Sequence, residues 1–541
     1  MTDLAEYRRQ LQKRWYDLGL YSSATLADYI NQNAERFPDA YIAFESGAHP
    51  DRLTYSQALA QSRKIAAAMH SLGISQGDRV AIQLPSWSEA MLVSQACILL
   101  GAVIVSVTGI LGESEVEFIV NDAEARLLFI PGQWRNRDYR DMVGQILART
   151  GVEQVVVVDA HAPEGALAWP EFVSRAGNDF PPATAGADEV VMQIYTSGTT
   201  ARPKGVLHSH NSLASEVKSA KAYLGDRLDL SVLNPWPFGH IASFMPFVRF
   251  WMEGVNCVVT DKWDADYVAR LVAEHQIGST SGVPYFLSSM VEAADAQNID
   301  ISCMSNYATG ATNVPPELIR LCNERGMFCY RMYGSTEHPT VTSGYAGDPL
   351  EKCIATDGRC MPGCEVRIVD EQGAALSQGE EGEVAIIGPD QFLGYSDPAR
   401  NQSAFTADGW FLTGDIGRVD SEGYLTITDR KKDIIIRGGE NISSREVEEC
   451  ILSHPSVAAA AAIAMPDMKL GEKVCIYVEC KPGNSLTITD VVEHFSAQKV
   501  AKQKTPEFLR LIEEMPRTAT GKINKQILRK LLKTEQDSIS G

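Results

Sequence analysis

The stretch "YTSGTTARPKG", residues 195–205, follows an apolar run, "EVVMQI" (189–194), that predicts a buried strand. It supplies two glycines, which permit close backbone approach, several hydroxyl side chains and the ammonium group of Lys204. The chain contains no G-x-x-x-x-G-K-[ST] string, so this is not that type of phosphate loop. On composition alone, a phosphate-binding loop and a solvated turn are both compatible with this stretch.

Short apolar runs alternate with longer amphipathic segments on both sides of the loop. Helices are expected at 87–100 and around 139–148, and another at 211–224 with Asn211 or Ser212 as its cap. Strands are expected at "RVAIQL" (79–84), "AVIVSV" (102–107), "RLLFI" (126–130) and "QVVVVDA" (154–160). This alternation predicts an α/β fold with layered, mostly parallel sheets and helices.

The chain has 541 residues, more than one hydrophobic core usually serves. Near Asp429 its character changes, because "TDRKKDIIIRGGENIS" (428–443) is first charged, then apolar, then rich in glycine. We therefore expect a large N-terminal domain over residues 1–430 and a small α+β C-terminal domain over 431–541. The hinge between the two domains is expected near 429–433.

Charge and hydropathy exclude several classes of protein. The net charge of −20, from 49 basic and 69 acidic residues, disfavours a nucleic-acid-binding protein. The start of the chain lacks the apolar core of a signal peptide. The one candidate membrane span, 90–107, is interrupted by Gln95, Gly101 and Ser106 and divides better into a helix and a strand. These features predict a cytoplasmic protein without a membrane span.

Eleven cysteines are scattered along the chain. The tightest group is "CIATDGRCMPGC", with Cys353, Cys360 and Cys364. No histidine lies near it in the sequence and the spacing is not that of a zinc site, so we expect no metal there.

The segments that follow the loop carry further motifs in a fixed order. They read "ATGATNVPPEL" (308–318), "YGSTE" (333–337), "GWFLTGD" (409–415) and "PRTATGKINK" (516–525). Together with residues 195–213, this series resembles the adenylate-forming enzymes: acyl-CoA synthetases, luciferases and the adenylation domains of peptide synthetases. The resemblance covers nearly the whole chain. It implies an enzyme that joins a carboxylate to the α-phosphate of ATP and releases pyrophosphate.

The resemblance implies which residues bind the phosphates. A transition state crowded with negative charge needs preplaced donors, cations and a metal. Glu337 would help to hold Mg²⁺, and Thr336 would contact the α-phosphate. The β- and γ-phosphates would be held by Thr196, Ser197, Gly198, Thr199, Thr200 and Lys204.

The nucleoside would be bound by residues of the later motifs. Asp415 has the acceptor oxygens for both ribose hydroxyls, and Arg430 would support the same sugar. The adenine would lie against Tyr333, near Gly334 and the backbone of Gly310, Ala311 and Thr312.

Lys522, in "PRTATGKINK", would bridge the substrate carboxylate and the α-phosphate during adenylation. A cation about 4 Å from such an anion is worth roughly 4 kcal/mol at an effective dielectric constant near 20. In the family the small domain then rotates, and the hinge position matches Lys432. Gly438 and Gly439 match the segment that the pantetheine arm of coenzyme A passes.

The acyl pocket would be built from residues 234–247, 281–287 and 331–344. His240 matches a position that borders the carboxylate, although an isolated histidine is often structural. His338 could shape the pocket, bond a polar substrate atom or simply pack. The lining side chains would be Phe238, Phe244, Met245, Val283 and Tyr285.

This lining favours a hydrophobic acid: medium-chain, alicyclic or a steroid side-chain acid. No aspartate near Pro237 could bind an α-amine, so amino acids are not expected. The Asn-Tyr-Pro string of siderophore aryl-acid activators is absent, yet an aryl-acid–CoA ligase stays an alternative. Residues 14–30 and "YGSTEHP" resemble the cyclohexanecarboxylate and medium-chain branch of bacterial acyl-CoA synthetases.

No carrier-protein domain follows within the 541 residues, so free coenzyme A is the expected acceptor. An adenylating enzyme that loads a separate carrier protein is the alternative. A light-emitting enzyme would share most of these motifs. A catalytically dead homologue is disfavoured by five retained residues: Lys204, Glu337, Asp415, Arg430 and Lys522. The protein could be a monomer or a homodimer.

Overall fold

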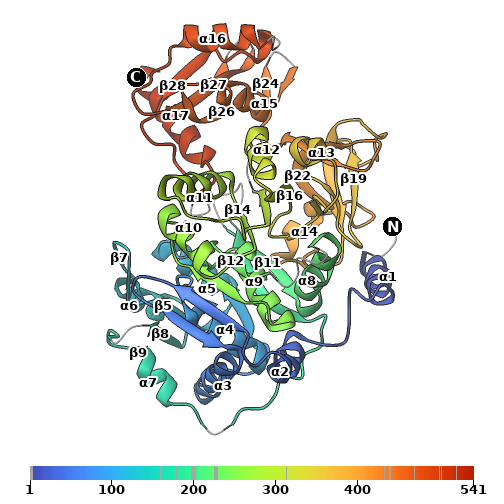
Figure 1. Cartoon of the computed structure of the whole chain (residues 1–541). Coiled ribbons are helices and arrows are strands. Elements are labelled where there is room, and N and C mark those ends of the chain that lie inside the picture. Colours follow the sequence, from blue (N-terminus) through green and yellow to red (C-terminus); the bar gives the residue numbers. More distant parts are fainter. Residues whose placement is uncertain are drawn as a thin grey trace.

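The computed structural model describes most of the chain: residues 4–158, 161–177, 179–196, 203–224, 230–311, 314–431, 433–437, 440–467, 470–498, 500, 502–518 and 521–540. Two large sheets with covering helices form its main body, an antiparallel sheet follows, and a small domain at the C-terminal end lies apart (Figure 1). The predicted α/β fold is confirmed.

The first large sheet contains the strand before the phosphate-loop motif. From β10 outward to β9 its strands are parallel, whereas β11 and β21 join antiparallel at the other edge. In order, the strands are β21 (Gly394–Tyr395), β11 (Lys204–Ser209), β10 (Val190–Thr196), β4 (Val103–Ser106), β3 (Arg79–Ile82), β5 (Ala125–Pro131), β8 (Gln154–Val158) and β9 (Ala166–Ala168).

The apolar segment 90–107 is divided as the sequence predicts. Helix α4 (Ser88–Leu100) is buried almost all round, and Gly101 ends it with a left-handed backbone (φ 77°). Strand β4 starts two residues later at Val103. A helix that is apolar all round is one that lies in the interior of the protein. Within the described residues, no helix is both long and apolar enough to cross a membrane.

The second large sheet is parallel from β1 to β16 and is extended by antiparallel strands at both edges. In order, its strands are β18 (Arg359–Cys360), β17 (Thr342–Ser343), β16 (Phe328–Tyr333), β15 (Asn306–Gly310), β14 (Ser279–Gly282), β12 (Val232–Asn234), β13 (Cys257–Thr260), β1 (Tyr41–Glu45) and β2 (Asp51–Thr54).

A third sheet is wholly antiparallel and was not foreseen from the sequence. Its four strands differ in pattern: two of them mix polar and glycine residues with single buried positions, whereas one carries a buried apolar run at 384–387. They are β19 (Glu365–Val369), β20 (Gly382–Ile387), β22 (Phe411–Val419) and β23 (Leu425–Arg430). A short hairpin elsewhere pairs β6 (Gln133–Trp134) with β7 (Arg137–Asp138).

Residues after 433 form a sheet with its own hydrophobic clusters. Its strands are β25 (Glu440–Ile442), β24 (Ile435–Arg437), β27 (Gly471–Cys480), β26 (Val457–Asp467) and β28 (Phe508–Leu511). Its helices are α15 (Ser444–Leu452), α16 (Ile488–Ala497) and α17 (Lys525–Ser540), with a 3₁₀ turn at Lys502–Lys504. The exact boundary at 430/431 stays a prediction.

Helix α8 (His210–Leu224) follows the phosphate-loop hairpin and starts one residue earlier than predicted. The Ser209 hydroxyl accepts the backbone N–H of Ser212 at 3.1 Å, and the Ser212 hydroxyl accepts that of Ser209 at 3.0 Å. Ser209 is therefore the cap, and the prediction of Asn211 or Ser212 was wrong. Asn211 instead bonds Ser22 and Asp188.

Most of the remaining helices cover the two large sheets (Figure 1), whereas the first helix packs through Leu11 and Trp15 against the antiparallel sheet. The remaining helices are α1 (Leu4–Asp17), α2 (Leu26–Arg36), α3 (Tyr55–Ser71), α5 (Glu113–Asp122), α6 (Val143–Arg149), preceded by a 3₁₀ turn at Arg140–Met142, α7 (Trp169–Ser174), α9 (Ile241–Glu253), α10 (Ala265–Glu274), α11 (Pro284–Gln297), α12 (Pro316–Glu324), α13 (Leu350–Ala355) and α14 (Pro398–Ala404).

Candidate active site

The phosphate-loop motif joins two paired strands. Strand β10 ends at Thr196 and β11 begins at Lys204, and these two residues are register partners. The loop between them is therefore held at both ends by the sheet. Eight residues predicted to bind ligands lie outside the described part of the chain: Ser197, Gly198, Thr199, Thr200, Thr312, Lys432, Gly438 and Gly439.

A buried polar cluster fixes the base of this hairpin. The Tyr195 hydroxyl donates to Asp122 at 2.5 Å and accepts from the Gln193 amide at 2.6 Å. Ser396 donates to the same Asp122 carboxylate at 3.0 Å. A Cβ at Gly205 would lie only 2.5 Å from the Ser396 hydroxyl oxygen, so a glycine is required there. None of these contacts was expected from the sequence, since their partners come from distant segments.

Glu337, the predicted metal ligand, lies close to the hairpin. Its Oε1 atom accepts a hydrogen bond from the Tyr395 hydroxyl at 2.8 Å, and its backbone carbonyl accepts from the Phe392 N–H at 2.7 Å. The Lys204 ammonium lies 5.1 Å from the centre of the Tyr395 ring. The structure thus brings two predicted residues, Lys204 and Glu337, to one tyrosine that the sequence did not single out.

The predicted adenine-side residues meet at the carboxyl ends of β15 and β16. These strands are parallel neighbours, with Gly310 paired to Met332, so Ala311 and Tyr333 follow side by side. A Cβ at Gly310 would lie 2.3 Å from the Met332 carbonyl oxygen. Gly334 is equally confined, because a Cβ there would lie 2.0 Å from the backbone carbonyl of residue 339. Contact with adenine stays a prediction.

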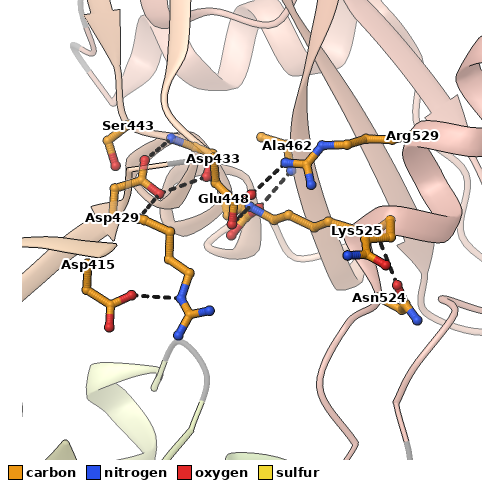
Figure 2. Close-up of polar contacts among 12 residues, drawn as sticks. Asp415, Asp429, Asp433, Ser443, Glu448, Ala462, Asn524, Lys525 and Arg529 are labelled. Atoms are coloured by element: carbon orange, nitrogen blue, oxygen red, sulfur yellow. Dashed lines mark hydrogen bonds and ion pairs between the residues drawn. The ribbon is translucent and has the colours of Figure 1, made fainter. Parts of the chain in front are cut away.

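Asp415 and Arg430 are register partners on β22 and β23 and form an ion pair of 2.7 Å (Figure 2). The other carboxylate oxygen of Asp415 accepts from the Tyr333 hydroxyl at 2.7 Å. Because each carboxylate oxygen has two lone pairs, both oxygens can accept further hydrogen bonds. Asp415 therefore keeps lone pairs for the predicted ribose hydrogen bonds. Its contact with Tyr333 links it to the adenine-side tyrosine.

Lys522 faces the body of the protein from the small domain. Burial, and to a smaller extent the nearby Lys522 charge, together lower the pKa of His240 to about 4. A Cβ at Gly521 would lie 3.5 Å from the Val283 side chain, so the lysine loop passes close to Val283 of the predicted pocket. Within the described residues, the buried Nε2 atom of His240 has no hydrogen-bond partner.

The predicted acyl-pocket residues differ in exposure. Phe238, Phe244 and Val283 are buried, and Met245 is half-buried. Phe244 stacks edge-on with neighbouring aromatic rings of α9 in the core. Tyr285, in contrast, is 56% exposed. These residues share a region of the fold, and their contact with substrate stays a prediction.

His338 lies in a buried cluster behind Glu337. Its Nδ1 atom is 2.9 Å from Asp390, and Cys364 Sγ is 3.5 Å from the same carboxylate and 3.9 Å from His338 Nε2. The donor atoms of this trio lie within 4.8 Å of one another. His338, which is not near these cysteines in the sequence, therefore lies beside Cys364 in space. Because hydrogen bonds among the three already occupy these atoms, packing is the favoured role for His338.

Hydrogen bonds cross the predicted domain boundary, and an ion pair and a further hydrogen bond join the segment just after it to the end of the chain (Figure 2). Asp429 accepts the backbone N–H of Ser444 at 2.6 Å and its hydroxyl at 3.1 Å. Asp433 pairs with Arg529 at 2.5 Å. Lys525, on α17, donates to the Ser444 hydroxyl at 2.9 Å. The helix that follows the Lys522 loop is thus tied to the segment around the boundary.

The fold, a large body with a small C-terminal domain, is that of an adenylate-forming enzyme. The chain belongs to the AMP-binding enzyme family, whose sequence profile matches residues 30–396. The profile of the AMP-binding enzyme C-terminal domain matches residues 446–522.

Curated and solved relatives agree with this assignment. The chain is 35% identical to a medium-chain fatty-acid–CoA ligase of Escherichia coli K12 over 97% of its own length and 93% of that protein. It is 30% identical to an indoleacetate–CoA ligase of Aromatoleum aromaticum, covering 89% and 94%. The crystal structure of ATP-bound MatB from Rhodopseudomonas palustris superposes with a TM-score of 0.83 at 27% identity, covering 93% and 98%. Relatives of this chain are thus acid–thiol ligases.

Proposed function

We propose that this protein is an AMP-forming acid–CoA ligase that activates a hydrophobic carboxylic acid. It would form an acyl-adenylate and pyrophosphate, then transfer the acyl group to free coenzyme A. One observation carries the proposal: Lys522 of the small domain lies close to His240, at the predicted carboxylate end of the acyl pocket. A cation at this position would offset the repulsion between the substrate carboxylate and the α-phosphate.

A carboxylate is a poor electrophile, so it is first activated by attacking the α-phosphate of ATP. Because the carboxylate and the phosphate are both anions, this step needs a cation between them. Lys522 would bind both the carboxylate and the α-phosphate and so offset their repulsion. Lys204, at the start of β11, would hold the phosphates that leave as pyrophosphate. His240 stays neutral near pH 7 because its pKa is about 4, so it does not compete for the anion as a second cation.

The donor set around Glu337 fits Mg²⁺, a metal that prefers carboxylate oxygens. Its Oε1 atom is engaged by Tyr395, and no hydrogen bond to its Oε2 atom comes from the described residues. When bound, Mg²⁺ would neutralise charge on the phosphates. Glu337 would hold the ion, and Thr336 would hold the α-phosphate beside it.

The acid is proposed to be medium-chain, alicyclic or a steroid side-chain acid. The apolar character of Phe238, Phe244, Met245 and Val283 supports this class, and so does the likeness to a medium-chain ligase. An aryl acid is the second candidate, because the chain is also similar to an indoleacetate–CoA ligase. We also infer a cytoplasmic enzyme, monomeric or homodimeric, because its cosubstrates would be ATP and coenzyme A.

The test is pyrophosphate release over a panel of acids, each with and without coenzyme A. The panel holds medium-chain, cyclohexane, benzoate-type, indole and steroid side-chain acids, plus several amino acids. We expect turnover on one hydrophobic class and an acyl-CoA product by mass spectrometry. Pyrophosphate release that coenzyme A does not stimulate would favour an enzyme that loads a carrier protein. No release with any acid would contradict the proposal.

A further inference from the structure

Strand β21 is only two residues long, yet its position is tightly fixed. It adds to the edge of the first large sheet beside β11, with Tyr395 opposite Val206. The backbone N–H of Ser396 donates to the Gly205 carbonyl at 2.8 Å, and that of Leu393 donates to the Leu207 carbonyl, also at 2.8 Å. Tyr395 is therefore attached to the strand that begins with Lys204.

The Tyr395 side chain is immobilised as well. It is 6% exposed, and its ring packs edge-on against Phe392 with centroids 4.9 Å apart. The Asn401 amide bonds both the backbone N–H and the carbonyl of Tyr395, at 2.9 and 3.2 Å. A ring held by a sheet edge, an aromatic neighbour and a side-chain clamp has one orientation.

That orientation aims the hydroxyl at Glu337. The donor–acceptor distance of 2.8 Å to Oε1 is that of a good hydrogen bond. The hydroxyl donates to the carboxylate, which therefore keeps one oxygen oriented by the protein.

The ring face serves a second predicted phosphate-site residue. The Lys204 ammonium lies 5.1 Å from the ring centroid, within the range of about 6 Å for a cation–π contact. A lysine side chain has many rotamers, and a fixed aromatic face restricts them. One tyrosine thus contacts both the proposed metal ligand and the proposed phosphate cation.

We propose that Tyr395 is a positioning residue for Mg²⁺–ATP: its hydroxyl orients the Glu337 carboxylate, and its ring orients the Lys204 ammonium. The inference rests on the proposed function, because it assumes that Glu337 and Lys204 bind the metal and the phosphates. Beyond that function, Tyr395 would set the distance between the Glu337 carboxylate and the Lys204 ammonium.

The chain offers a matched tyrosine remote from the nucleotide site. Tyr424 is also 6% exposed, its hydroxyl donates to Asp348 at 3.0 Å, and Lys352 lies 4.7 Å from its ring centre. A Tyr→Phe change at either position removes one hydroxyl that donates to a carboxylate and retains the ring under a lysine. Only position 395 touches residues proposed to bind Mg²⁺–ATP.

The experiment measures ATP binding by titration calorimetry over a range of Mg²⁺ concentrations, without acid or coenzyme A, for wild type, Tyr395→Phe and Tyr424→Phe. We expect Tyr395→Phe to raise the half-saturating Mg²⁺ concentration about tenfold, as for a lost hydrogen bond to a charged group. Tyr424→Phe should match wild type in this respect. Thermal denaturation reports whether both variants fold equally well.

A second comparison separates positioning from a general structural role. In a Glu337→Ala background, Tyr395→Phe should change ATP binding by less than about twofold, because coupled residues are not additive. The inference is wrong if Tyr395→Phe has the Mg²⁺ dependence of wild type, or if its effect persists undiminished beside Glu337→Ala. If wild type itself shows no Mg²⁺-dependent ATP binding, the proposed function fails, and the inference falls with it.

Discussion

The nucleotide side of the site is built from strand ends, whereas the predicted acyl side is built from side chains packed along helices. Lys204, Gly310 and Tyr333 each lie at the end of a strand, where the backbone register fixes their neighbours. Phe244 and Tyr285 lie on α9 and α11, and one is buried while the other is 56% exposed. A site at strand ends can be predicted from short sequence motifs, because the backbone register fixes it. A site lined by helix side chains depends on how the whole domain packs.

The largest effect is expected at Lys522, which would join the two sides. In Lys522→Ala, adenylation should slow about a thousandfold, because a contact worth roughly 4 kcal/mol is lost. Thioester formation from supplied acyl-adenylate should be spared. Rapid-quench measurement of each half-reaction tests this.

The control for that experiment is Lys530→Ala, an exposed lysine on α17. It should leave both half-reactions within about twofold of wild type, since exposed charges contribute little. Equal damage to both half-reactions in Lys522→Ala would contradict the assigned role.

Asp415 tests the nucleotide side alone. Asp415→Asn should lower kcat/KM for ATP about a hundredfold, because two hydrogen bonds from the ribose to a charged group would be weakened. The preference of the enzyme for ATP over 2′-deoxyATP should shrink at the same time. Steady-state kinetics with both nucleotides measures this.

The matched change is Asp420→Asn, in the turn between the same two strands, where the carboxylate pairs with Lys352 at 2.7 Å. It should alter neither the kcat/KM nor the nucleotide preference. If Asp415→Asn kept the full preference for the 2′-hydroxyl, the ribose assignment would be wrong.

Asp429 tests the contacts across the domain boundary. It accepts two hydrogen bonds from Ser444 in the arrangement that brings Lys522 near His240. Asp429→Asn removes the charge and should slow adenylation about tenfold. The transfer step from supplied acyl-adenylate should not slow, because that step requires a different domain orientation in the family.

Asp467→Asn is the comparison, because that carboxylate forms its 2.6 Å ion pair with Lys473 wholly within the small domain. Its two half-reactions should slow equally or not at all. A uniform loss of both steps in Asp429→Asn would mean that the boundary contact serves stability alone.

Local sequence was enough to place several elements of the first large sheet. The strands near 79, 102 and 126 and the helix at 87–100 lie within two residues of their predicted bounds, because alternating apolar runs depend on short-range periodicity. In the antiparallel sheet, β22 and β23 carry no such run, and that sheet was not foreseen.

Long-range packing explains what the sequence did not reveal. Tyr395 lies 58 positions from Glu337, and no spacing rule connects a tyrosine of a two-residue strand to that glutamate. The buried contact of Cys364 with His338 has the same cause, since 26 residues separate them in sequence. Such pairs are defined only when sheets and loops are assembled.

On the acyl side, Val283→Ala tests whether a buried residue contacts substrate. Enlarging a hydrophobic pocket by one or two methyl groups changes chain-length discrimination by about 1–3 kcal/mol per methylene. We expect kcat/KM to shift several-fold toward longer or bulkier acids, with KM for ATP unchanged. Val291→Ala, a buried valine of the same helix region, should lower stability without shifting the preference. Identical profiles for both variants would exclude Val283 from the pocket.

The smallest effect is expected at Glu216 of α8, which is buried and accepts a hydrogen bond from the Thr340 hydroxyl at 2.6 Å. Burial, followed by the charge of Asp390, raises the pKa of Glu216 well above its ordinary value. The folded state therefore retains this proton above the unfolded pKa of about 4.3. As pH rises from there toward the raised folded pKa, the folded state loses stability relative to the unfolded state.

Glu216→Gln keeps the shape of the protonated acid and removes its titration. The variant should therefore gain free energy of unfolding over wild type as pH increases from 5 to 9, by at most about 1.4 kcal/mol per pH unit. Denaturant unfolding across this range measures the difference, and exposed Glu493→Gln should give a flat, near-zero curve. A flat curve for Glu216→Gln would mean that this carboxyl is ionised in the folded protein.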